Sequence, residues 1–296
     1  MIIAAEVADL PPGPKVVAVG SFDGVHLGHQ SLLAKARLLA DQERLPLLVY
    51  TFDPPAKVFT RGLRMLSTLS EKLDLLREQG VDLTLAVAFN ENFAARDKAA
   101  FLHDLVRLEA RRIVVGEDFA FGRGRSGGTA DLQTAAPTLS VPLLVLGGEP
   151  VKSTRIRNLL ERGDVEAARH LLGRPYEARG IVQRGDQVGQ RLGFPTANVE
   201  TSPGKVLPRG VFAVRVWVAQ RTYPAVVNVG TRPTVGRDSA VRLEAHLLGF
   251  SGVLYGDELR VVFLKKLRDE RSFDSLEALS KQIARDVESA RRFFRL

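Results

Sequence analysis

The hydrophobic pattern of this chain changes once, at the segment Gly173-Arg174-Pro175, and this change most constrains what the chain can fold into. Before it, short apolar runs alternate with stretches of helical periodicity. Strands are expected over 16–20, 46–52, 83–89, 111–116 and 141–147, and helices over 32–40, 70–80, 97–108, 153–161 and 164–172. Mostly apolar strands that alternate with helices predict a parallel sheet covered on both faces. Ligands of such sheets bind beyond the carboxyl ends of the strands.

After residue 175 the pattern consists of short β-rich segments separated by turn residues. These segments are 177–184, 211–219, 222–229, 241–248 and 259–264. One amphipathic helix is expected over 275–294, with Asp274 and Glu277 as its capping pair. Short strands followed by a terminal helix predict a small β-barrel. A length of 296 residues also favours two domains, which we place at 1–172 and 176–296.

Composition narrows the functional classes. The chain has no cysteine, which excludes disulfides, thiolate metal sites and cysteine nucleophiles. No apolar run approaches the roughly 18 residues of a membrane span, and the first residues lack the pattern of a secretion signal, so a cytoplasmic location without membrane contact is expected.

The net charge of +8 is uneven along the chain. Basic and acidic residues number 21 and 21 up to residue 170, and 21 and 13 after it. Such an excess fits a solvated surface, a nucleic-acid site or a polyphosphate site. Clustered cations with interleaved aromatics, which single-stranded nucleic acids require, are missing, so no nucleic-acid partner is expected.

The segment 20–30, GSFDGVHLGHQ, lies where the first expected strand gives way to the first helix. Its glycines let the backbone approach a ligand, and the N–H groups of a helix start favour a phosphate. His26 and His29 would share one face of the first turn and donate hydrogen bonds to a phosphoryl group. A glycine-rich turn with two ordinary surface histidines is the alternative.

A second segment, KSTRIR at 152–157, places hydroxyl groups at another expected helix start. Capping of the helix is the common explanation, and the same donors can hold a triphosphate. Together the two segments resemble the H-x-G-H and second phosphate-binding motifs of the nucleotidyltransferase superfamily. The resemblance implies catalytic roles for His26 and His29. It implies nucleotide contacts from Gly20, Phe22, Gly28, Ser153, Thr154 and Arg157.

Between these motifs, the segment 116–125, GEDFAFGRGR, combines aromatic residues, glycines and arginines. This mixture suits a flat ring and a phosphate, and it equally suits a loop anchored by two core phenylalanines. The segment resembles the adenylylating module of bacterial FAD synthetases. That resemblance implies flavin contacts from Asp118, Phe119 and Phe121.

The segment 185–198, GDQVGQRLGFPTAN, carries three glycines within nine residues, which is typical of a turn that wraps a phosphate chain. On an extended stretch the oxygens of Thr196 and Asn198 point the same way, and such hard ligands suit Mg²⁺ bound with a nucleotide. A proline-terminated β-turn is the alternative. In 241–247, Leu243, Ala245 and Leu247 face one side of a strand, opposite a polar face.

The segment 185–198 resembles the Gly-Phe-Pro-Thr-Ala-Asn signature of riboflavin kinases. This resemblance implies nucleotide contacts from Gly185, Gly189, Thr196 and Asn198, the last two also as metal ligands. It implies that Glu244 takes the proton of the ribityl hydroxyl that attacks ATP. It implies flavin contacts from Arg268, Glu270 and Phe273.

Taken together, the chain resembles bifunctional riboflavin kinase/FAD synthetases of prokaryotes over nearly its whole length. The implied fold is a Rossmann-like α/β nucleotidyltransferase domain followed by a small β-barrel kinase domain with a terminal helix. The implied substrates are riboflavin, FMN and ATP, with Mg²⁺; weak self-association stays open. Pro55, Lys152 and Gln190 depart from the usual family residues.

Two alternatives therefore stay open for this chain. One is a riboflavin kinase whose adenylylating module is weakened. The other is a nucleotidyltransferase that acts on a different small phosphate ester, which would leave the Pro-Thr-Ala-Asn segment without a role.

Overall fold

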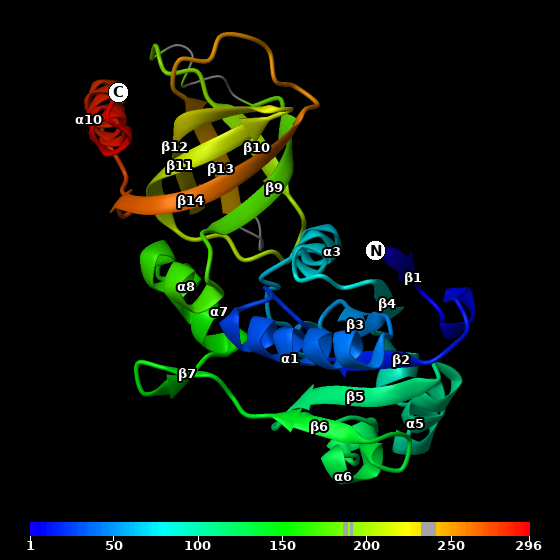
Figure 1. Cartoon of the computed structure of the whole chain (residues 1–296). Coiled ribbons are helices and arrows are strands. Elements are labelled where there is room, and N and C mark those ends of the chain that lie inside the picture. Colours follow the sequence, from blue (N-terminus) through cyan, green and yellow to red (C-terminus); the bar gives the residue numbers. More distant parts are fainter. Residues whose placement is uncertain (186–188, 190–191, 232–240) are drawn as a thin grey trace. The chain divides into compact units, whose positions relative to one another are not determined.

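The computed structural model describes the chain except residues 186–188, 190–191 and 232–240, and it divides into two compact units (Figure 1). The N-terminal unit is Met1–Ser153, and the C-terminal unit is Thr154–Leu296. Each unit is described by itself below.

The N-terminal unit is built on a six-stranded sheet in which every pair of neighbouring strands is parallel. Its order is β1-β4-β3-β2-β5-β6. The strands are β1 Ile2–Ala4, β2 Lys15–Val19, β3 Leu47–Asp53, β4 Leu83–Ala88, β5 Ala110–Gly116 and β6 Thr138–Val141. The parallel sheet expected from the alternation of strands and helices is confirmed.

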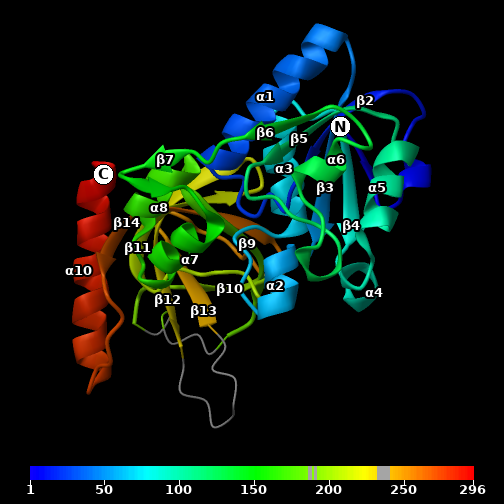
Figure 2. The same ribbon diagram turned by 90° about the horizontal axis from the view of Figure 1, so that it is seen from below.

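Helices cover both faces of this sheet (Figure 2). The helices are α1 Leu27–Glu43, α2 Ala56–Arg61, α3 Leu69–Glu78, α4 Glu91–Ala94, α5 Lys98–Arg107 and α6 Thr129–Leu132, with short 3-10 turns at Val7–Asp9 and Arg123–Arg125. Successive side chains of a strand point to opposite faces. In β2, Val16 and Ala18 pack with Leu33 of α1, whereas Val17 and Val19 belong to the core beneath α5. Burial on both faces explains why the strands are apolar throughout.

The strand order reverses at β2. From this strand the chain runs outward to β3 and β4 on one side, and β5 lies on the other side. In a parallel sheet, the loops at such a reversal separate and leave a crevice beyond the carboxyl ends of the strands. The loops that follow β2 and β5 are those of the H-x-G-H segment and of the segment 116–125.

The limits predicted for a strand over 141–147 are wrong, because the structure has two separate strands in this region. The sheet strand β6 ends at Val141, because the next residue, Pro142, has no N–H to donate to a ladder. The following apolar residues form β7, Val145–Leu146, which pairs antiparallel with β8, Glu149–Pro150. The turn between them is the pair Gly147-Gly148, both with positive φ, which is typical of a tight hairpin.

Two helices precede the barrel of the C-terminal unit. Helix α7, Ser153–Glu161, begins at the border of the units, and α8 spans Val165–Leu172. Gly173 ends α8 in the left-handed conformation, at φ 73°, as its position after the apolar stripe predicted. Helix α8 packs against β9 and β14 of the barrel.

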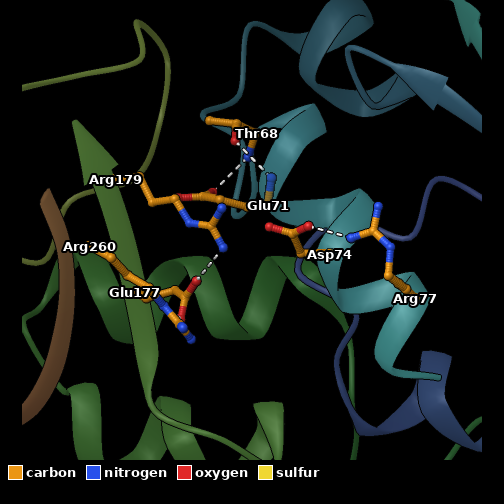
Figure 3. A network of polar contacts seen from close by, with 7 residues as sticks. All are labelled: Thr68, Glu71, Asp74, Arg77, Glu177, Arg179 and Arg260. Carbon is orange, nitrogen blue, oxygen red and sulfur yellow. Dashed lines mark hydrogen bonds and ion pairs between the residues drawn. The ribbon is translucent and has the colours of Figure 1, made fainter. Parts of the chain in front are cut away.

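The barrel is a closed sheet of six strands in the order β10-β13-β12-β11-β14-β9, and every pair of neighbouring strands in it is antiparallel. The strands are β9 Tyr176–Gln183, β10 Ala197–Thr201, β11 Gly210–Val218, β12 Arg221–Thr231, β13 Val241–Leu247 and β14 Glu258–Arg268. Side chains also join β9 to β14, since Glu177 of β9 pairs with Arg260 of β14 at 2.6 Å; Glu177 also pairs with Arg179 of its own strand at 3.5 Å (Figure 3). The predicted β-barrel is confirmed, and β10 is an additional strand.

The terminal helix α10, Leu276–Phe294, packs on the outside of the barrel (Figure 1). Its Val287 and Ala290 share a core cluster with Val211, Ala213 and Val226. The predicted capping pair of Asp274 and Glu277 is wrong. Ser275 is the N-cap, because its hydroxyl accepts the N–H of Ala278 at 3.1 Å.

Candidate active sites

The loop after β2 is held in one conformation by the segment before α3. The carboxylate Oδ1 of Asp23 accepts the backbone N–H groups of Leu66 at 2.8 Å and Ser67 at 3.2 Å, and the hydroxyl of Ser67 accepts the N–H of Gly24. Asp23 is 3% exposed. Phe22 is fully buried and lies at φ 46°. Its ring belongs to the core, so a nucleotide contact from this predicted residue would come from its backbone.

The two histidines of the loop lie together at the start of α1. His26 is the N-cap of the helix, and its Nδ1 accepts the N–H of His29 at 3.3 Å. The two imidazole rings stack, with centroids 3.6 Å apart and an angle of 14° between their planes. A neutral ring that accepts at Nδ1 carries its proton on Nε2, which can then donate to a ligand. The pair is therefore arranged as adjacent donors at a helix N-terminus.

The second motif meets this loop at its first residue. The hydroxyl of Ser153 donates to the carbonyl of Asp23 at 3.0 Å. A side chain at Gly28 would come within 3.3 Å of the carbonyl of Val151 and 3.2 Å of the ring of His26, so the close approach favours glycine there. Thr154 is exposed and Arg157 is buried, and both belong to the C-terminal unit. Of the second motif, Ser153 is thus the residue that the structure places beside the histidine loop.

The segment after β5 forms a closed loop around aromatic side chains. The backbone groups of Phe121 and Gly127 exchange hydrogen bonds at 3.0 and 2.9 Å. The ring of Phe121 packs 4.8 Å from that of Phe101 and lies in the core, so it matches the anchoring role named as the alternative above. Phe119 is half-buried and Asp118 is exposed. Of the three flavin contacts predicted in this segment, Asp118 and Phe119 are therefore the two that a ligand can reach.

Four cationic side chains gather around Asp118. The ammonium of Lys152 lies 3.1 Å from its carboxylate, and Arg125 donates to its backbone carbonyl at 3.2 Å. The pKa of Lys57 is lowered, first by partial burial and then by the neighbouring charges of Lys152, Arg61 and Arg125. The negative charge of Asp118 acts in the opposite direction and raises this pKa. With one carboxylate among four cations, the loop is suited to an anionic ligand.

In the C-terminal unit, most residues predicted from the kinase resemblance line one cavity of about 270 Å³. These are Gly189, Thr196, Asn198, Glu244, Arg268, Glu270 and Phe273. The eighth, Gly185, contacts the cavity indirectly, because a Cβ there would overlap the amide of Asn198. The carbonyl of Gly189 accepts the N–H of Phe194 at 2.8 Å, which closes the turn before the Pro-Thr-Ala-Asn residues.

Glu244 lies in the middle of a row across three strands. In the sheet register, Asn198 of β10 and Asn228 of β12 lie on either side of Glu244 in β13. Residues in register on neighbouring strands point to the same face, and all three line the cavity. Leu243, Ala245 and Leu247, on the other face of β13, are buried in the barrel core. The predicted alternation of this strand is therefore confirmed. The row offers one carboxylate between two amides at the cavity wall.

His246 supports the Pro-Thr-Ala-Asn segment from the same strand. Its Nδ1 lies 2.8 Å from the carbonyl of Pro195, and its ring meets that of Phe194 edge to face at 5.7 Å. These contacts assign His246 to holding the segment in place.

The loop 268–273 is fastened to α10. Arg268 forms a bidentate ion pair with Asp286, with contacts of 2.8 to 3.1 Å, and Gln282 donates to the same carboxylate at 2.7 Å. Arg271 donates to Gln282. The guanidinium groups of Arg268 and Arg271 lie over the ring of Phe273, 5.8 and 4.8 Å from its centroid. The structure therefore ties Arg268 to the helix, and Arg268, Glu270 and Phe273 all line the cavity.

Four polar residues to which the sequence analysis assigned no site role also line the cavity. These are Asn228, Arg242, Arg271 and Asp286. One signal was present for Asp286: it stands four residues after Gln282 on the stripe of α10 that also carries Val287, so a polar pair interrupts an apolar face. Asn228 also begins the segment 228–234, NVGTRPT, which resembles a loop of riboflavin kinases; residues 232–234 of that segment, and residues 190 and 191, lie outside the described part of the chain.

Comparison with known proteins matches a different family model to each part of the chain. A family model described as FAD synthetase matches residues 10–156, and one described as riboflavin kinase matches residues 172–294. The bifunctional riboflavin kinase/FMN adenylyltransferase of Escherichia coli strain K12 is 40% identical over 292 residues, covering 95% of this chain and 93% of the relative. The protein of the same name from Bacillus subtilis strain 168 is 35% identical over 291 residues, covering 94% and 92%.

A solved structure agrees in fold over the full length. The crystal structure described as a macrolide-efflux protein from Streptococcus pneumoniae has a TM-score of 0.87 and 30% identity, covering 98% of each chain. Within the residues described here, no helix has the length and apolar character needed to cross a membrane. By its two matched domains and its full-length relatives, the chain belongs to the family of bifunctional riboflavin kinase/FMN adenylyltransferases.

Proposed function

We propose that this chain phosphorylates riboflavin to FMN in its C-terminal domain and adenylylates FMN to FAD in its N-terminal domain, using one ATP in each step. The observation that carries the proposal is the row in which Glu244 lies between Asn198 and Asn228 at the wall of one cavity. A carboxylate held there is suited to orient a nucleophile for phosphoryl transfer.

In the kinase step, Glu244 accepts the proton of the terminal ribityl hydroxyl. The hydroxyl oxygen forms a bond to the γ-phosphorus of ATP, the bond from this phosphorus to the β–γ bridging oxygen breaks, and ADP leaves. The apolar side chains of Leu192, Leu279 and Ile283 line the same cavity and provide a surface for the flavin ring. The loop 268–273 would close against that ring.

Mg²⁺ is part of this proposal. The oxygens of Thr196 and Asn198 are hard donors at one cavity wall, which fits the preference of this ion. Clusters of three or more histidine, cysteine or acidic side chains are lacking among the described residues, so we expect phosphate oxygens and water to complete the coordination. The ion would neutralise charge on the phosphates of the bound nucleotide.

In the adenylylation step, a phosphate oxygen of FMN forms a bond to the α-phosphorus of ATP, and pyrophosphate leaves as the α–β bridging bond breaks. The stacked pair of His26 and His29 at the N-terminus of α1 would donate to the phosphates as charge shifts onto the leaving group. Ser153 keeps the second motif beside this loop through its bond to Asp23. The cations around Asp118 would attract the anionic substrates.

The departures from the usual family residues define the alternative, a riboflavin kinase with a weakened adenylyltransferase. Pro55 is buried before α2, and Lys152 pairs with Asp118, one of the predicted flavin residues. Incubation with riboflavin, ATP and Mg²⁺, followed over time by chromatography, decides between the two. We expect FMN to rise first and FAD to follow; accumulation of FMN alone would leave only the kinase, and absence of both would reject the proposal.

The remaining partners follow from the chemistry. Riboflavin, FMN and ATP are the proposed substrates, and nucleic acid is not among the proposed partners. Because ATP is generated and consumed in the cytoplasm, we propose that location for the enzyme. Size-exclusion chromatography at several protein concentrations would test for weak self-association.

A further inference from the structure

The most deeply buried cation of the N-terminal unit, among its described residues, lies under the histidine loop. Lys72 of α3 is 0% exposed. Its ammonium donates to the carbonyl of Phe52 at 2.7 Å and contacts the hydroxyl of Thr51 at 3.3 Å and the carbonyl of Ser21 at 3.4 Å. One side chain therefore joins the carboxyl end of β3 to the loop that follows β2.

The residues around Lys72 are buried or held by hydrogen bonds. Thr51 is itself fully buried and donates to the carbonyl of Ser21 at 3.1 Å. Helix α3 is fixed at its start by a capping box between Thr68 and Glu71, in which both hydrogen bonds are present (Figure 3). The ammonium of Lys72 therefore reaches the loop from a helix whose first turn is fixed by hydrogen bonds.

The charge of Lys72 faces two carboxylates. Asp23 comes from the histidine loop and Asp53 from the end of β3. Burial lowers the pKa of Lys72 to about 8, and Asp23 and Asp53 limit this fall. A methionine of similar length would fill the same space without the cost of burying an ammonium. The position of a retained buried charge at the carboxyl edge of the sheet therefore points to function.

We propose that Lys72 is a positioning residue for adenylyl transfer: its ammonium fixes the loop of His26 and His29 against the end of β3 and compensates Asp23 and Asp53 where the phosphates bind. This inference rests on the adenylylation proposed above for the N-terminal domain. Without the ammonium, two carboxylates face an anionic substrate, and the loop keeps its bond to Thr51 but loses the contacts through which Lys72 joins it to Phe52 at the end of β3. ATP binding and the transfer rate both fall, while the kinase site is untouched.

The test measures both activities of the full chain in each preparation. K72M is expected to lower kcat/KM for FMN adenylylation roughly 10–100-fold, the range for groups that orient a site's own ligands. Its riboflavin kinase activity is expected to stay within about twofold of the wild type. The matched control is K15M: Lys15 is also a buried lysine, but it lies at the amino end of β2, where it donates to the carbonyl of Gly13 at 2.6 Å. Both activities of K15M are expected to be retained.

The pH profile separates a positioning role from a structural one. Wild-type adenylylation is expected to fall as the pH rises through about 8, where the ammonium loses its proton, and the kinase rate is not expected to follow. K72R keeps its charge to higher pH, so this alkaline limb should move upward.

Two results would overturn the inference. One is a K72M enzyme that adenylylates FMN within about twofold of the wild type; the other is an alkaline limb that K72R leaves in place. If K72M does not fold, the pH profiles of adenylylation by K72R and by the wild type still test the positioning role of Lys72. A wild type that forms no FAD from FMN at any pH would instead reject the proposed function.

Discussion

Substitution of Asp286 by alanine removes the anchor of the loop 268–273. The carboxylate of Asp286 is 7% exposed and holds Arg268, whose side chain is 20% exposed, in a bidentate pair. Breaking a fully buried pair costs about 3–5 kcal/mol. Because Arg268 keeps some solvent contact and still donates to the carbonyl of Asp269 at 2.9 Å, we expect the lower figure of about 2–3 kcal/mol for the C-terminal domain.

The same substitution should act on the kinase through flavin binding. A loop released from α10 no longer presents Glu270 and Phe273 to the cavity, so the KM for riboflavin should rise at least about tenfold, which corresponds to about 1.4 kcal/mol. FMN adenylylation should be unchanged. The assay is steady-state kinase kinetics together with urea unfolding, and E288A, an exposed acid on the same helix, is the control. A D286A enzyme with wild-type riboflavin KM would refute the anchoring role.

Two further outcomes follow from the structure. The pKa of Lys72 is about 8 in the folded chain against the ordinary 10.5, so the unfolded chain binds its proton more tightly and stability rises with pH between these values. At roughly 1.4 kcal/mol per pH unit, wild type should gain about 3 kcal/mol over K72M between pH 7 and 10.5, measured by urea unfolding; parallel curves would contradict this. In G185A the new methyl group displaces the amide of Asn198, so the kinase kcat should fall about tenfold or more with adenylylation intact, and equal loss of both rates would contradict the assignment.

Much of the fold could be predicted because local patterns agreed with the tertiary structure. The stripe that contains Leu33 and Ala36 predicted the buried face of α1, and Gly173 predicted the end of α8. The wrong strand limits occurred where the structure of a segment depends on which other strand it pairs with. Residues 141–147 are apolar enough for a sheet strand, but the Gly-Gly turn pairs Val145 and Leu146 with residues 149–150 in a separate hairpin instead.

The site could be predicted only in part, for a related reason. Motif residues such as Glu244 are recognisable from their own segments, whereas the row in which Asn198 and Asn228 lie on either side of Glu244 is set by the register of β13 with β10 and β12. Asp286 and Lys72 read as ordinary helix surface residues because charged side chains usually face solvent. Each stands on the apolar stripe of its helix, however, as Lys72 does with Leu75 and Leu76. A charge on such a stripe is the signal that sequence reasoning overlooked.

The claim on which the account depends is that the two domains hold separate ATP-using sites, one built around Glu244 and the other around the histidine pair. The direct test gives the variants E244Q and H29A riboflavin with ATP, and in a second reaction FMN with ATP. E244Q should form no FMN and still convert supplied FMN to FAD, while H29A should accumulate FMN and form no FAD. Loss of both products in either variant, or FAD synthesis that survives in H29A, would contradict the account.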